Sequence, residues 1–115
     1  MAPEPAAPPA PPAVAALPAR VVDALERIRH ACEPERVFLF GSYATGRAHA
    51  RSDVDLIVVT SGRGWCTTPQ QIRQLFWTRP YDVDAIVLTP QELAEQQADP
   101  SSFVSTVLPR AIHLL

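Results

Sequence analysis

Two short motifs of the sequence could do chemistry together: Gly41-Ser42 and, after ten intervening residues, Asp53-Val54-Asp55. Strand side chains alternate between faces, so Asp53 and Asp55 project to the same side of one strand. Two carboxylates held side by side repel each other unless a cation lies between them, and such oxygen ligands suit Mg²⁺ together with substrate phosphates. A glycine lets a ligand approach the backbone closely, and a serine hydroxyl can bond a phosphate oxygen. The pattern therefore predicts a metal–nucleotide site.

A third carboxylate is expected from the next apolar run along the chain. Nucleotidyl transfer can use two metal ions about 3.5–4 Å apart, which clamp the attacking oxygen and the departing pyrophosphate. Asp84 lies inside the apolar run of residues 83–87 and is the preferred third ligand. Asp82 has the same strand parity but lies nearer the start of the run, so it is the weaker candidate.

The site segments resemble a known family. Residues 40–46 (FGSYATG) followed by residues 51–56 (RSDVDL) are similar to the signature of the DNA polymerase β-like nucleotidyltransferases, in particular their small prokaryotic branch, the minimal nucleotidyltransferases. The resemblance covers about residues 20–115, and Asp84 matches the third acid of the family. It implies an α/β (α+β) fold in which helices pack on one face of a mixed β-sheet.

The resemblance also implies a role for each site residue. Gly41 and Ser42 hold the triphosphate of a nucleoside triphosphate. Asp53 and Asp55 bind both Mg²⁺ ions. Asp84 ligates the catalytic ion and helps to deprotonate the acceptor hydroxyl. These three aspartates are the predicted catalytic and metal-binding residues.

The sequence departs from the family pattern at one position. Thr45 stands where many members carry an arginine before the glycine, so one phosphate-side cation is missing. Arg47 or Arg51 could replace it, and Arg51 is included with Gly41 and Ser42 among the predicted nucleotide-binding residues.

The resemblance implies a protein partner as well. Minimal nucleotidyltransferases are commonly paired with a small helical HEPN toxin, which they neutralise as an antitoxin by adding AMP from ATP to a tyrosine. An active enzyme of this kind is the leading hypothesis. A catalytically weak or inactive antitoxin that acts by stoichiometric binding is the alternative, and nucleotidyl transfer to a small molecule such as an aminoglycoside is a further alternative.

Hydrophobic periodicity and helix-start signals predict the elements that position these residues. Apolar residues at helical spacing predict a first helix, and Thr-Pro-Gln-Gln and Thr-Pro-Gln-Glu are typical of capped helix starts. Short apolar runs bounded by turn residues predict strands. The expected elements are a helix over 18–32, strands over 36–40 and 53–60, helices starting at 68, 89 and 99, a strand over 81–88 and a final strand over 111–115.

Composition limits the possible functions. The chain has 115 residues, which suffices for one domain, expected over residues 19–115, after an Ala/Pro-rich tail over residues 1–18 that we expect to be disordered. A net charge of −2 and the absence of lysine argue against nucleic-acid binding by phosphate neutralisation. No apolar run is long enough to span a membrane, so a cytoplasmic protein is expected.

The two cysteines, Cys32 and Cys66, are too few to suggest a disulfide framework, and reduced thiols are expected. Trp65 and Trp77 are expected in the core or at its edge, and exposure of either would indicate an interface with a partner.

Overall fold

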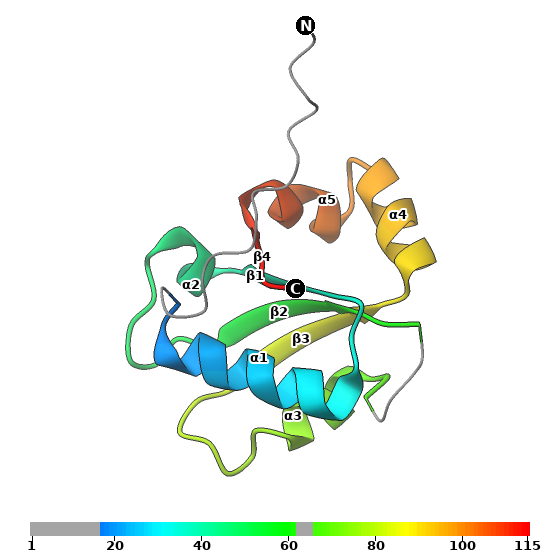
Figure 1. Cartoon of the computed structure of the whole chain (residues 1–115). Helices are drawn as coiled ribbons and strands as arrows, with labels where there is room; N and C mark the ends of the chain where they lie inside the picture. Colours follow the sequence, from blue (N-terminus) through cyan, green and yellow to red (C-terminus); the bar gives the residue numbers. More distant parts are fainter. Residues whose placement is uncertain (1–16, 62–65) are drawn as a thin grey trace, which may run out of the picture.

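A four-stranded mixed sheet forms the centre of the computed structural model, which describes residues 17–61 and 66–115 (Figure 1). The strand order is β3-β2-β1-β4; β2 and β3 are parallel, and β1 is antiparallel to both of its neighbours. The strands are β1 (Arg36–Phe40), β2 (Val54–Val59), β3 (Val83–Leu88) and β4 (Ile112–His113). This arrangement confirms the expected mixed α/β fold class.

Helices occupy the connections between the strands. They are α1 (Ala19–Cys32), α2 (Ser42–Thr45), α3 (Pro69–Gln74), α4 (Pro90–Ala98), α5 (Phe103–Val107) and the 3-10 helix η2 (Leu108–Arg110). The expected elements are therefore present, and the final strand is shorter than predicted. Residues 1–16 of the tail that was predicted over residues 1–18 lie outside the described residues, and so does Trp65.

The predicted helix starts are confirmed for α3 and α4. Thr68 caps α3 and Thr89 caps α4; in each case the threonine side chain and the side chain three residues later form a reciprocal capping box. At α5 the cap is Ser102 rather than Asp99, whose carboxylate instead accepts hydrogen bonds from Ser101.

The sheet is covered on both faces, which corrects the expectation of helices on one face. Val21, Leu25 and Ile28 of α1 and Ile72 of α3 pack on the face to which Leu56 of β2 points. The opposite face carries a second apolar cluster, to which β2, α4 and α5 contribute Ile57, Leu93 and Val104. The physical reason is the unbroken apolar run of β2, because a strand buried on both faces loses the alternation of polar and apolar residues.

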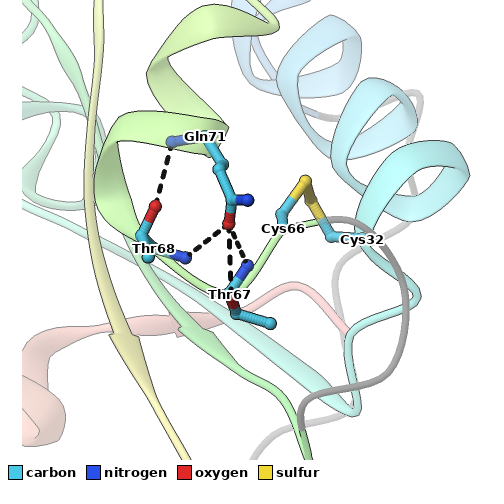
Figure 2. The surroundings of a disulfide bond; sticks show 5 residues. All are labelled: Cys32, Cys66, Thr67, Thr68 and Gln71. Carbon is cyan, nitrogen blue, oxygen red and sulfur yellow. Dashed lines mark hydrogen bonds between the residues drawn. A yellow bond between two sulfur atoms is a disulfide. The ribbon is translucent and has the colours of Figure 1, made fainter.

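A disulfide between Cys32 and Cys66 corrects the expectation of reduced thiols (Figure 2). Cys32 ends α1 and Cys66 precedes the capping box of α3, so the bond joins the two helices that cover the same face. The two Cα atoms lie 4.7 Å apart, a separation that disulfides adopt, and both side chains are buried. Sequence spacing gave no sign of this pairing, because the two residues meet only through the packing of α1 and α3.

Within the ranges 17–61 and 66–115, no helix combines the length and the hydropathy that a membrane span requires.

Candidate active site

The predicted carboxylates form part of a row that crosses the sheet. Asp55 of β2 is the register partner of Phe40 on β1 and of Asp84 on β3. All three side chains share the parity of the face on which α4 and α5 pack, and Asp53 and Asp82, each two residues earlier along its chain segment, have the same parity. The structure therefore brings Asp53, Asp55 and Asp84 to one edge of one face, as predicted.

Gly41 makes room for the central carboxylate of the row. A Cβ atom at Gly41 would lie 2.1 Å from Oδ2 of Asp55, a distance at which one of the two groups must move. The backbone of Gly41 has φ +71° and ψ −153°, a combination that only glycine adopts readily. The glycine of the motif is thus required twice, for the shape of the backbone and for the space beside Asp55.

Ser42 follows as the first residue of α2 and is half-buried. The turn closes through hydrogen bonds from the amides of Ala44 and Thr45 to the carbonyl of Gly41. The Thr45 hydroxyl donates to carbonyl oxygens of the same turn, so this residue serves the local backbone.

The predicted phosphate arginine, Arg51, lies in the exposed loop before β2. Its amide donates to Nδ1 of His49. Two hollows open beside the carboxylate row, and Arg51 is not among the described residues that line them. Arg47, the other candidate, is also exposed and lies just after α2. A nucleotide-binding role of Arg51 therefore remains a prediction.

A hollow of about 380 Å³ opens at the β3 end of the row. The described residues that line it are Asp53, Arg73, Asp82, Val83 and Asp84. Three carboxylates and one guanidinium thus face the same space. Asp82, the weaker candidate of the sequence analysis, belongs to this hollow, and Arg73 of α3 was missed because a single helix arginine carries no signal in the sequence.

Burial and neighbouring charge act together on Asp55. Partial burial is the larger cause and the negative charges of Asp84 and Asp53 add to it, so the pKa of Asp55 rises to about 6. A raised carboxyl pKa between like charges indicates a site where a cation would be favourable, because the cation removes the repulsion.

Two contacts from α1 hold the segments that lead into the acidic strands. The Arg20 guanidinium donates to the carbonyl of Ala50 at 2.8 Å, in the loop before β2. The Tyr81 hydroxyl donates to Asp23 at 2.5 Å, just before β3, and Arg79 pairs with the same carboxylate at 3.3 Å. Burial and the bond to Asp23 raise the pKa of Tyr81, so this hydroxyl keeps its proton. Both acidic strands are thereby anchored to the helix behind the sheet.

The donor set fits a hard divalent cation in its chemistry. Asp53, Asp55 and Asp84 supply only oxygen ligands, which Mg²⁺ prefers, and Asp55 and Asp84 are register partners on the adjacent strands β2 and β3. As the side chains stand, the described residues contain no group of three or more acidic, histidine or cysteine side chains that already converges on one metal position. Binding would therefore require these carboxylates to change rotamer, which the exposure of Asp53 and Asp84 permits.

Comparison with known proteins gives the same assignment for most of the chain. The family model described as polymerase beta, nucleotidyltransferase matches residues 24–105, which include both motifs and all three predicted acids. Among curated proteins, no relative matches the chain. The family match covers more than half of the chain, and it includes the Gly-Ser turn that lies against the carboxylate row. The chain therefore belongs to the polymerase beta nucleotidyltransferase family.

Proposed function

We propose that this nucleotidyltransferase domain transfers AMP from ATP to a hydroxyl with the help of Mg²⁺, and that the hydroxyl belongs to a tyrosine of a partner HEPN toxin. The observation that carries the proposal is the row in which Asp55 lies between Gly41 and Asp84. It combines a position where the backbone can meet a triphosphate with oxygen ligands for a metal.

Each residue of the row has a task in this reaction. Gly41 and Ser42 would contact the triphosphate, and Asp53, Asp55 and Asp84 would hold magnesium. When bound, the magnesium ions would neutralise charge on the triphosphate and on the departing pyrophosphate. Asp84 would accept the proton of the attacking hydroxyl, because it lines the hollow through which an acceptor can reach the row.

Arg73 adds a cation to the acidic hollow. Arg73 lines the same space as Asp53 and Asp84, whereas Thr45, where the arginine is missing, does not line this hollow. A positive charge there would orient the acceptor or the phosphate that it receives.

The proposed partner is supported by an exposed tryptophan, Trp77, which lies four residues after Arg73 in the sequence. Trp77 is 85% exposed and follows α3, the helix that carries Arg73. Tryptophan is enriched among the residues that dominate protein interfaces. We expect a partner that covers Trp77 to present a tyrosine to the acidic hollow.

The proposed pairing with a toxin implies a cytoplasmic location for this protein. In that compartment the Cys32–Cys66 pair would be kept largely reduced. The fold is expected to tolerate this, because both side chains lie in the core, where a free cysteine behaves as a small apolar group.

Intact-mass spectrometry of the toxin tests the enzyme and its acceptor together. The chain is incubated with ATP, Mg²⁺ and the proposed HEPN partner, and the toxin is expected to gain one or more AMP units. The double variant Asp53→Ala, Asp55→Ala should give no gain, whereas Glu95→Ala, which removes an exposed acid on α4, should act like the wild type. Equal modification by the double variant would contradict the proposal.

The stoichiometric antitoxin remains a second candidate, because Thr45 replaces a phosphate-side cation and the carboxylates do not already converge. It predicts that the Asp53→Ala, Asp55→Ala variant still neutralises the toxin in cells. Loss of neutralisation by a variant that still binds the toxin would rule this candidate out.

A further inference from the structure

A second hollow, of about 460 Å³, opens at the other end of the row. Phe40, Gly41 and Thr45 line it from β1 and the turn after it. Phe103 and Val107 of α5, with Arg110 of η2, line it from the other side. Unlike the acidic hollow, this one contains no carboxylate among its described lining residues, so the two ends of the row differ in chemistry.

An aromatic pair forms the wall of this apolar hollow. The rings of Phe40 and Phe103 meet edge to face, with their centroids 5.6 Å apart. Phe103 is nevertheless 54% exposed, and within the described part of the chain only Phe103 and Trp77 are large apolar residues with such exposure. A ring that is held by a neighbour and still open on one side provides a surface on which a planar group can stack.

The apolar hollow is in direct contact with the carboxylate row. Gly41 lines the hollow, and its Cα lies against the carboxylate of Asp55. Neighbouring strands are about 4.8 Å apart, so Phe40 and Asp84 lie roughly 10 Å apart across β2. A molecule with its phosphates at Asp55 could therefore place a planar ring in this hollow.

The polar groups at the rim complement a heterocycle. The Thr106 hydroxyl donates to the carbonyl of Ser102 at 3.1 Å, which leaves its oxygen lone pairs to accept from a ring amino group. Arg110 is exposed and offers guanidinium donors to ring nitrogens. Ligand sites are commonly built in this way, from an apolar concave wall with a few polar groups.

We propose that this hollow binds the adenine base of ATP, with the ring stacked on Phe103, Thr106 accepting from the amino group and Arg110 at the rim. This proposal rests on the proposed function. It assigns the two ends of the row to the two substrates: the base at the Phe40 end, and the acceptor hydroxyl at the acidic end, where Asp84 can receive its proton.

Calorimetric titration with two probes tests the assignment. ATP and inorganic tripolyphosphate, each with Mg²⁺, share the triphosphate and differ in the nucleoside. Wild-type protein is expected to bind ATP more tightly than tripolyphosphate. Phe103→Ala should weaken ATP binding about tenfold and leave tripolyphosphate binding unchanged, because base–aromatic stacking contributes to the first alone.

Two further variants keep the test independent of folding. Thr106→Trp places a large side chain at an exposed position of the hollow and should also weaken ATP binding alone. Trp77→Ala removes the other exposed aromatic residue, outside the hollow, and should change neither affinity. The melting temperature of each variant is measured alongside.

The outcomes separate this proposal from the proposed function. Equal wild-type affinities for the two probes, or ATP binding unaffected by both Phe103→Ala and Thr106→Trp, would overturn the base site and leave the triphosphate site intact. If the wild type binds neither ATP nor tripolyphosphate, both proposals are overturned.

Discussion

The two faces of the sheet differ in how completely helices cover them. We call the face under α1 and α3 the closed face, and the face under α4 and α5, where the carboxylate row lies, the open face. On one face β2 contributes Leu56 and Val58 to a core closed by α1 and α3 and crossed by the Cys32–Cys66 bond. On the other, Asp53 and Asp55 project beside the part that α4 and α5 cover. The closed face stabilises the fold, whereas the open face holds like charges together at a cost in stability. Substitutions in the core of the closed face should therefore lower stability, whereas replacing a carboxylate of the open face should lower activity and raise stability.

The largest expected effect on stability comes from the closed face. Leu56 is fully buried, so Leu56→Ala removes apolar contacts and leaves a cavity. The free energy of unfolding should fall by about 3–4 kcal/mol, which denaturant titration would measure. A loss below about 1 kcal/mol would contradict the described packing of this face.

The disulfide should contribute somewhat less. Cys32→Ser with Cys66→Ser opens a crosslink between residues 34 positions apart and should lower the free energy of unfolding by about 3 kcal/mol under oxidising conditions. Under reducing conditions the wild type should approach the stability of the variant. If a reductant leaves wild-type stability unchanged, the bond makes no contribution in solution.

At the boundary of the open face, Gly41 and Gly46 form a matched pair with positive φ. Gly41→Ala adds a Cβ that collides with Asp55, whereas a Cβ at Gly46 would meet no atom within 4 Å. We expect Gly41→Ala to destabilise by about 2–3 kcal/mol and to abolish nucleotidyl transfer. Gly46→Ala carries only the backbone strain, about 1 kcal/mol, and should keep activity. Equal effects on transfer would show that the space beside Asp55 is unimportant.

The smallest expected effect on the free energy of unfolding is an increase, whereas the preceding substitutions lower it. The pKa of Asp55 is raised in the folded protein, so the folded state binds this proton more tightly than the unfolded state. Its favourable contribution is complete below pH 4 and is lost as the pH rises through about 6. Asp55→Asn should therefore stabilise the metal-free protein at pH 8 by about 1 kcal/mol, after allowance for the partial exposure of the group, and by almost nothing at pH 4. Thermal unfolding at the two pH values measures this; destabilisation at pH 8 would contradict the account.

Local patterns predicted the parts of the site that lie within one segment. Asp53 and Asp55 could be placed on one face from strand parity, and Asp84 from its position in the next apolar run. The parallel pairing of β2 with β3 then brought Asp84 beside Asp55, as the shared parity required.

The sequence could not predict tertiary contacts between segments that are far apart along the chain. Arg73 reaches the acidic hollow from α3, and Phe103 reaches the apolar hollow from α5, yet neither has a motif around it. Cys32 and Cys66 are joined for the same reason, through helix packing. The burial of the second face of the sheet was indicated by the unbroken apolar run of β2. That run was compatible with burial on one face or on both, so the sequence did not decide between them.

Which face binds the nucleotide is tested most directly by amide chemical-shift mapping with Mg²⁺ and a non-hydrolysable ATP analogue. The amides of Gly41, Asp55 and Asp84 should shift on titration, while those of Val21 and Ile28 on the closed face should not. Shifts that gather on α1 and α3, or no shifts at all, would contradict a nucleotide site on the open face.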